Sequence, residues 1–196
     1  MGLPAARWFS RSDSPLARAA SFLTTLPLVF PPIALGYILL MLLGKNGPLG
    51  APLYDHFGLR LVFSQAGVAA GAFTAGLPLF VRPVQAAFQS PEVMKYEEAA
   101  RVMGCGPFKT FFLVTAPLSR RSIYSGLLLA VARASGEVGI TMMLGGNIAG
   151  RTNTLSLEIF NCVSRGDFDE ATRLCLMLAS VSLAIYFVLE KLQRGR

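Results

Sequence analysis

"YEEAARVMGCGPFKTFFLVTAPLSR", residues 96–120, is a charged, glycine-punctuated insert in an otherwise apolar chain. It opens with two acids, Glu97 and Glu98, as a surface helix often does, and then reaches Gly104, Gly106 and Pro107. Glycine just past the last turn ends many helices, and proline cannot continue one. The insert therefore predicts a short helix, a sharp turn and a second segment that leads back to the apolar part of the chain.

The residues just before the quoted stretch supply the start of this helix. Ser90 is a preferred N-cap, Pro91 suits the first helical position, and Glu92 suits the positive end of the helix dipole. We expect the helix to begin at Pro91 and to end near Gly104. An inert connector between two membrane spans would carry the same local signals, so these residues alone do not assign a function.

The composition of the whole chain is that of a membrane protein. The 196 residues are 53% hydrophobic and 15% charged, whereas a soluble domain is typically about 25% charged. An apolar stretch of about 20 residues crosses a bilayer as a helix, and we expect four spans, at about 22–44, 62–81, 123–145 and 174–189. The predicted fold class is all-α, a polytopic transmembrane helix bundle. A soluble core helix would explain one such stretch but not four in so short a chain.

The positions of Lys and Arg predict the orientation. With the N-terminus inside, the inside segments 1–21, 82–122 and 190–196 hold twelve basic residues. The outside segments hold five, namely Lys45, Arg60, Arg151, Arg165 and Arg173. Because cytoplasmic loops are enriched in Lys and Arg, we expect a multi-pass protein of a bacterial or archaeal cell membrane with both termini in the cytoplasm. The net charge of +7 is then explained by membrane topology. The sequence has no stripe of Lys and Arg interleaved with aromatic residues, so we do not expect nucleic-acid binding.

Residues 98–117 resemble the EAA motif of the permeases of binding-protein-dependent ABC importers. The motif reads Glu-Ala-Ala, three residues, Gly, nine residues, Ile, one residue and Leu-Pro; here Val114 replaces Ile and Ala116 replaces Leu. The resemblance implies that the loop at about 82–122 carries a coupling helix that docks on an ATP-binding subunit. The coupling residues that it implies are Glu97, Glu98, Ala99, Ala100, Gly104 and Pro117.

This resemblance also implies the architecture and the partners. We expect one transmembrane permease domain, 1–196, of the ABC importer permease type, which works as a homodimer with ATP-binding cassette subunits and an extracytoplasmic oxyanion-binding protein. A phosphate-cradling Gly-x4-Gly-Lys-[Ser/Thr] loop does not occur in the sequence, since Gly44-Lys45 is followed by Asn46. We therefore expect a transport subunit, not an enzyme, with ATP hydrolysis on a separate chain. We expect no cofactor or metal, because His56 is the single histidine and the three cysteines fit no metal-binding spacing.

The flanking apolar segments favour a substrate class. Residues 26–50 and 132–160 resemble molybdate-type permeases, and "GNIAGRTNTL", 146–155, is similar to loops of tungstate and sulfate permeases. The resemblance implies import of a tetrahedral oxyanion, with molybdate expected and tungstate or sulfate as alternatives. It starts at about residue 15, so we expect the first helix of the family to be missing. A small integral membrane channel or enzyme is the alternative from a different class.

Two groups of residues are candidates for the translocation path or its gate. Arg133 and Glu137 fall inside the third expected span, where charges normally face the bundle interior or water. Because they are four residues apart on one expected helix, they could instead neutralise each other and fix helix packing. We favour this structural pair over a binding site for the anion, because a permease that releases its substrate cannot bind that substrate tightly. Asn147, Arg151 and Thr152 lie in a glycine-rich loop whose backbone N–H groups can face an anion. A functional role for that loop, as an outer gate or a contact with the substrate-binding protein, and a simple extracellular turn are equal alternatives.

Overall fold

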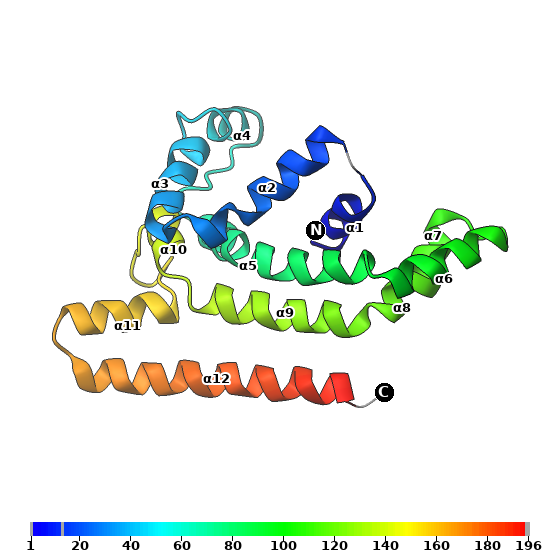
Figure 1. The fold of residues 1–196 in the computed structure, drawn as a ribbon. Coiled ribbons are helices and arrows are strands. Elements are labelled where there is room, and N and C mark those ends of the chain that lie inside the picture. Colours follow the sequence, from blue (N-terminus) through cyan, green and yellow to red (C-terminus); the bar gives the residue numbers. More distant parts are fainter. Residues whose placement is uncertain (1, 13, 195–196) are drawn as a thin grey trace. The chain divides into compact units, whose positions relative to one another are not determined.

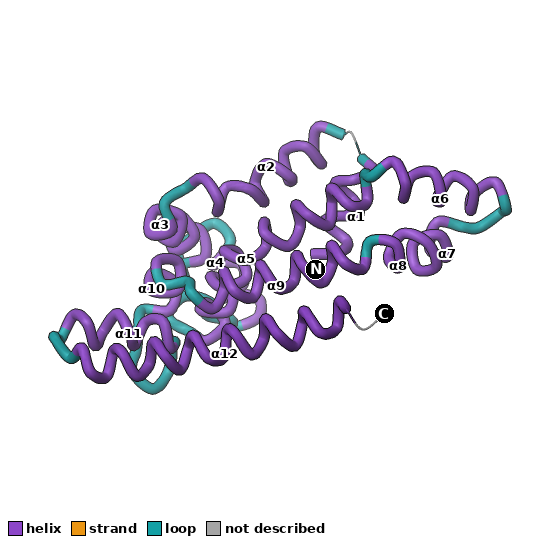
Figure 2. Tube along the Cα trace, turned by 60° about the horizontal axis from the view of Figure 1, so that its bottom comes forward, coloured by secondary structure: helices purple, strands orange, loops and turns teal. Residues whose placement is uncertain are grey.

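The computed structural model describes residues 2–12 and 14–194, and every regular element within these ranges is helical (Figures 1 and 2). The elements are α1 (Gly2–Arg11), α2 (Pro15–Val29), α3 (Pro32–Leu43), α4 (Gly50–Phe57), α5 (Gln65–Phe88), α6 (Pro91–Val102), α7 (Pro107–Thr110), the π-helical turn η1 (Phe111–Thr115), α8 (Ala116–Leu118), α9 (Arg120–Ser135), α10 (Gly139–Gly145), α11 (Leu155–Ser164) and α12 (Phe168–Arg194). The all-α fold class is confirmed.

The helix predicted from the quoted stretch is α6, and both of its ends are confirmed. At its start the Ser90 hydroxyl accepts a hydrogen bond from the backbone N–H of Val93, and Pro91 is the first helical residue. At its end Gly104 has φ +80; its N–H bonds to the carbonyl of Arg101, and the N–H of Cys105 bonds to that of Ala100. This pair of bonds is a Schellman motif, which needs a left-handed residue at the Gly104 position.

The second segment of the insert contains a widened turn. In η1 the N–H of Ala116 bonds to the carbonyl of Phe111, five residues earlier. Pro117 follows and has no N–H with which to continue a regular α-helical ladder. The wide turn carries Thr115, which is buried, on the side of α6.

The described chain falls into two compact units. The first comprises Met1–Thr25, Leu77–Ala130 and Leu189–Arg196. Its core joins α1 to the second half of α5, where Ala6 and Phe9 pack with Val81, Val84 and Phe88. The ring of Phe111 meets that of Phe88 edge to face, with 5.9 Å between centroids. The α6–α8 segment thus shares a core with the N-terminal helix.

The second unit comprises Leu26–Gly76 and Val131–Val188. Its main contact is between α3 and α10, which lie side by side in Figure 1. A methyl group on Gly36 would come within 2.9 Å of the Met143 side chain and 3.0 Å of the Ile140 backbone. Small residues let helix backbones approach closely in membrane proteins, and here Gly36 lets Leu35, Ile140 and Leu144 form a buried core.

Two of the four expected spans correspond to single helices of sufficient length, and a third does so only if a bent helix pair counts as one span. α5 and α12 are each long and apolar enough to cross a membrane. The third expected span is not one straight helix: α9 ends at Ser135, α10 begins at Gly139, and the two are bent by 61°. Such a pair forms a broken span or a re-entrant loop.

The first expected span, at 22–44, is not a single helix. It is divided between α2, which ends at Val29, and α3, which begins at Pro32. A residue before proline is pushed out of the helical region, and proline removes a backbone donor. Phe30 precedes Pro31, and Pro31 precedes Pro32, so the helix must break at this point.

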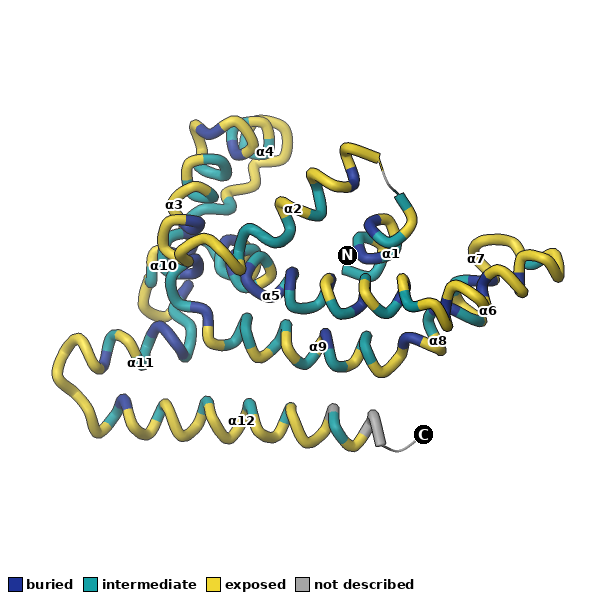
Figure 3. Tube along the Cα trace, viewed as in Figure 1, coloured by how far each residue is buried: buried dark blue, intermediate teal, exposed yellow. Residues whose placement is uncertain are grey.

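α12 differs from the other long helix in its exposure. About two-fifths of the most apolar stretch of α5 is buried within the protein (39%), compared with 6% for α12. Figure 3 shows this helix exposed along most of its length. An exposed apolar helix of this length suits a lipid environment, in which every backbone group is satisfied within the helix.

Candidate functional site

The most buried charge of the first unit is Glu97, on α6. Its side chain is 1% exposed, and the Arg7 Nη1 lies 2.6 Å from its Oε1. Arg11 contacts Oε2, and the Thr115 hydroxyl donates to Oε1. A buried carboxylate is tolerated when it is paired and hydrogen-bonded, and the partners of Glu97 come from α1 and η1.

The helical repeat of α6 separates the two acids of the motif. Val93, Glu97 and Ala100 are buried on one face, as expected for positions four and then three residues apart. Glu98 and Ala99 are exposed. The predicted coupling residues therefore have two kinds of surroundings. Glu97 and Ala100 are on the buried face of α6, whereas Glu98 and Ala99 are on its exposed face.

The cluster around Glu97 carries an excess of positive charge. Arg101 is also 3.9 Å from Oε2, one turn further along α6, so three guanidinium groups surround one carboxylate. Burial, and then repulsion by Arg101, lower the pKa of Arg7; burial followed by repulsion from Arg7 and Arg101 lowers the pKa of Arg11. The guanidinium of Arg7 also lies 5.4 Å from the centre of the Phe111 ring. These contacts tie the N-terminal helix to α6.

The turn after α6 forms an apolar tip, defined by Val102, Met103 and Phe108, which are 84%, 76% and 82% exposed. Gly104, within it, holds the left-handed turn, and Pro117 is exposed beyond it. Soluble surfaces rarely expose large side chains in such a contiguous group. This α6–α7 tip lies on the same exposed part of the insert as Glu98.

Arg133 and Glu137 form an ion pair in the second unit. The Arg133 Nη1 lies 2.6 Å from Glu137 Oε2, and the Glu137 side chain is 1% exposed. The prediction that both lie on one helix was wrong, because α9 ends at Ser135. Glu137 instead lies in the break, where its Oε1 accepts a hydrogen bond of 2.8 Å from the N–H of Ile140. The carboxylate thus satisfies an N–H in the first turn of α10.

The glycine-rich loop after α10 is held by its own side chains. The Thr152 hydroxyl is buried; it donates to the carbonyl of Gly145 (2.7 Å) and accepts from the N–H of Ile148 (2.9 Å). Asn147 has φ +48, and its amide donates to that of Asn161 on α11 at 2.7 Å. Arg151 is exposed. Asn147 and Thr152 therefore fix the conformation of the loop, whereas the side chain of Arg151 is exposed.

Several residues of these sites could not be assigned from the sequence. Arg7 and Arg11 are four residues apart and therefore on one face of α1, but the sequence did not show which acid they would meet. Thr115 carried no signal beyond its place in the motif. Arg151 lines a cavity of about 750 Å³ together with Lys45 and Arg60. The only sequence feature that could have grouped these three residues is that all of them lie in the segments expected outside the membrane. Among the described residues no group of three His, Cys, Asp or Glu side chains could hold a metal ion.

The family model of the binding-protein-dependent transport system inner membrane component matches residues 1–194. The chain belongs to this family. As an inner membrane component, it is a transport protein, and its apolar helices α5 and α12 agree with that location.

Relatives of this inner membrane component include two bacterial permeases. The chain is 39% identical over 175 residues to the Molybdenum transport system permease protein ModB of Escherichia coli (strain K12), covering 87% of this chain and 76% of the relative. It is 35% identical over 195 residues to ModB of Azotobacter vinelandii, covering 99% and 85%. It is also 30% identical over 194 residues to Sulfate permease 2, chloroplastic, of Chlamydomonas reinhardtii, covering 99% of this chain and 52% of that protein.

Proposed function

We propose that this chain is the membrane-spanning permease subunit of an ATP-driven importer for molybdate. The observation that carries the proposal is the long match to permeases named for molybdenum transport, at 39% identity over 87% of the chain. The fold supports it, because the motif that resembles the EAA sequence forms a capped helix that presents Glu98 and an apolar tip. In this proposal the 1–196 chain is one permease domain and the segment 82–122 its coupling loop.

Energy input comes from a separate ATP-binding subunit in this proposal. The α6–α7 tip docks on that subunit, and Glu98 meets it from the exposed face of α6. Glu97 does not touch the partner; it holds α6 against α1 through Arg7 and Arg11. Movement of the docked subunit is then transmitted to the N-terminal helix as well as to α9.

The other two partners in this proposal are a second copy of the permease and a binding protein outside the membrane. A second copy of the permease supplies the other wall of the pathway, since one bundle with few spans encloses little space. A binding protein outside the membrane delivers the oxyanion. Both termini and the α6–α7 tip face the cytoplasm, as the bias in basic residues indicates.

The two candidate path groups receive different roles. Arg133 and Glu137 form a neutralising pair that sets the break between α9 and α10; its support is the 2.6 Å contact and the capping of Ile140. Arg151 faces the entrance, with Asn147 and Thr152 holding its loop in place.

Sulfate is the second candidate substrate, favoured by the similarity to the chloroplast sulfate permease. Sulfate, molybdate and tungstate are all tetrahedral dianions at neutral pH, so shape and charge separate them poorly. A competition assay distinguishes them: proteoliposomes with the ATP-binding subunit and the binding protein should take up labelled molybdate, and unlabelled sulfate in moderate excess should not abolish the uptake. Uptake of sulfate with no uptake of molybdate would reject the proposed substrate.

The coupling surface is tested by charge reversal. Glu98→Lys should leave a monodisperse, membrane-inserted protein and reduce molybdate-stimulated ATP hydrolysis, because the exposed acid faces the partner. Asp169→Lys, an equal change at an exposed residue of α12, is the matched control and should retain stimulation. Full stimulation in Glu98→Lys, with normal uptake, would mean that α6 is not the joint.

The orientation is tested with single cysteines in a variant that lacks Cys105, Cys162 and Cys175. An impermeant thiol reagent added to intact cells should label Ala149→Cys, and should label Lys109→Cys only after the cells are opened. Both positions are exposed. The opposite labelling pattern would reverse the proposed topology.

A further inference from the structure

A cavity of about 750 Å³ in the second unit has only basic residues among its charged lining residues. It is bounded by the end of α3, the 44–50 loop, α4 and the 59–64 segment, and its basic residues are Lys45, Arg60 and Arg151. In the proposed topology all three lie outside the membrane. Arg151 is remote in the sequence from the other two, so its place in the same cavity is a product of the fold.

Tyr54, on α4, holds two of these cations in the cavity. The Lys45 Nζ lies 4.6 Å, and the Arg60 Cζ 5.1 Å, from the centre of its ring. The Arg60 Nη2 donates to the Tyr54 hydroxyl at 3.2 Å. This hydrogen bond, and then the charges of Lys45 and Arg60, lower the pKa of Tyr54. The hydroxyl accepts from Arg60 and keeps its own proton for donation to a ligand.

Lys45, Arg60 and Arg151 form no salt bridge within the described part of the chain, although Asp55 follows Tyr54 directly. Salt bridges to glutamates are formed there by Arg7, Arg11, Arg101, Arg133, Arg165 and Arg173. Like charges gathered in one concave site repel one another unless an anion occupies it.

The backbone that presents Lys45 is tightly wound. The N–H of Gly47 bonds to the carbonyl of Gly44 at 2.8 Å, and the N–H of Leu49 bonds to that of Leu42 at 3.0 Å. A methyl group on Gly50 would lie 2.0 Å from the Gly44 carbonyl oxygen. This turn therefore requires glycine at position 50, and it fixes the start of the Lys45 side chain.

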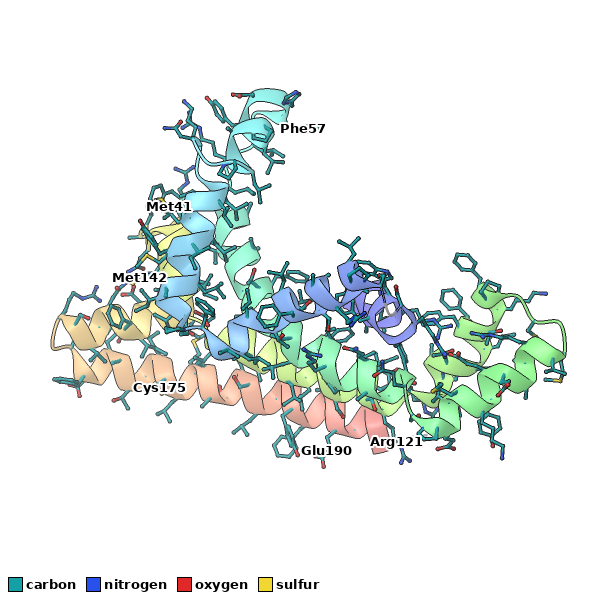
Figure 4. The ribbon with its side chains drawn as sticks, turned by 45° about the horizontal axis from the view of Figure 1, so that its top comes forward. Met41, Phe57, Arg121, Met142, Cys175 and Glu190 are labelled. Atoms are coloured by element: carbon teal, nitrogen blue, oxygen red, sulfur yellow. The ribbon has the colours of Figure 1, made fainter. Side chains whose placement is uncertain are left out.

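The surroundings of the cavity include exposed apolar side chains. Met41, which lines it, is 50% exposed, and Phe57 at the end of α4 is 72% exposed; Figure 4 labels both. Leu49 and Leu59 are also more than half exposed. Basic residues and tyrosine beside exposed apolar groups are typical of the membrane–water interface, so both a dissolved anion and a lipid head group can reach the site.

We propose that Lys45, Arg60, Arg151 and the Tyr54 hydroxyl bind a tetrahedral oxyanion group. Its oxygens accept hydrogen bonds from the three cations and from the phenol. Two sources share this chemistry, a free dianion and the phosphate of an anionic lipid. The free-dianion source rests on the proposed function, whereas the lipid source does not.

Binding to the purified full-length chain tests this site directly. One arm measures the binding of labelled molybdate in detergent by equilibrium dialysis. The other arm uses native mass spectrometry to count phosphatidylglycerol molecules retained by the protein. At least one arm should show binding that weakens about fivefold in Lys45→Gln and in Arg151→Gln, as expected for the loss of one exposed charge contact, and that falls further at high salt. Arg173→Gln removes the same charge outside the cavity and should bind as the parent chain does.

A conservative variant protects the test against misfolding. Tyr54→Phe keeps the ring that the two cations contact and removes only the hydroxyl, so it should stay folded and lose a smaller, about twofold, part of the affinity. The proposal is overturned if neither probe binds, or if the cavity variants bind as tightly as Arg173→Gln.

Transport assays separate this site from the proposed function. Molybdate-stimulated ATP hydrolysis that persists in a chain with no charge-dependent binding at the cavity would reject the site alone. A chain that transports no oxyanion but retains phosphatidylglycerol through Lys45 and Arg151 would reject the proposed function and support the site.

Discussion

Glu97 and Glu137 are both buried carboxylates with 1% side-chain exposure, and each contacts an arginine at 2.6 Å. They differ in where the arginines come from. Glu137 pairs with Arg133, four residues earlier. Glu97 pairs with Arg7 and Arg11 of α1, and Arg7 precedes it by 90 residues.

This difference separates two uses of a buried charge. The Glu137 pair organises a break between two consecutive helices, because the same carboxylate also accepts from Ile140. The Glu97 cluster joins segments that are remote in sequence, and it ties α1 to α6 within the first unit. A buried ion pair is not by itself a large source of stability, but removal of one partner is costly. The non-local cluster should therefore be the more sensitive of the two.

The largest effect is expected when Glu97 loses both remote partners. Arg7→Ala/Arg11→Ala leaves a buried carboxylate with the distant Arg101 and Thr115, and should destabilise the first unit by about 3–5 kcal/mol. Thermal unfolding in detergent and the yield of monodisperse protein measure the loss. Lys109→Ala/Arg121→Ala removes two exposed charges from the same unit and is the matched control. Equal losses in the two double variants would show that Glu97 does not depend on α1.

A smaller effect is expected at the local pair. Arg133→Ala should cost roughly 2–3 kcal/mol, less than the full value for a buried pair, because Arg133 is partly exposed and Glu137 keeps the N–H of Ile140. Arg133→Ala/Glu137→Gln should recover most of that loss, because the amide oxygen can still accept from Ile140.

Replacement of Glu137 by alanine separates pairing from capping. Arg133→Ala/Glu137→Ala removes both the ion pair and the hydrogen bond to the N–H of Ile140. Its free energy of unfolding should be about 1 kcal/mol lower than that of Arg133→Ala/Glu137→Gln. Folding yield and molybdate uptake are measured together. A fully folded Arg133→Ala protein that has lost uptake would instead place Arg133 on the translocation path.

The backbone conformation near the two glutamates also differs, and Gly104→Ala tests this difference. The helix that carries Glu97 ends at Gly104 with φ +80, whereas none of residues 136–138 has a positive φ. Gly104→Ala should cost about 1 kcal/mol through backbone strain, since a methyl group there meets nothing within 4 Å. Gly106→Ala, in equally open space with φ −67, should be near neutral. Indistinguishable melting temperatures for the two variants would rule out strain at the turn.

The smallest effect is expected at Glu158, a partly exposed carboxylate of α11. A hydrogen bond from Arg165, and then those from Asn161 and Asn153, lower the pKa of Glu158 from 4.5 to about 2. A depressed folded-state pKa adds stability above the unfolded value, and this stability is lost as the pH falls toward 2. The parent chain should therefore exceed Glu158→Gln slightly in stability at pH 6, and the gap should close between pH 4.5 and 2. A gap independent of pH would show that charge is not involved.

Local rules of chain geometry determined much of what the sequence predicted. Ser90, Pro91 and Gly104 defined both ends of α6, because caps and left-handed turns act within a few residues. The apolar stretches predicted α5 and α12. The pairing of Arg133 with Glu137 was also predicted, since four residues bring two side chains together even though the helix ends between them.

Only the tertiary structure decided which side of α6 is buried and what meets it there. Glu97 and Glu98 are adjacent acids with equal local signals, and packing of α1 against α5 places Arg7 and Arg11 over one of them. The same holds for Lys45, Arg60 and Arg151, which share a cavity through the folding of three separate loops. Contacts between distant segments depend on how apolar faces pack, and no local spacing records that arrangement.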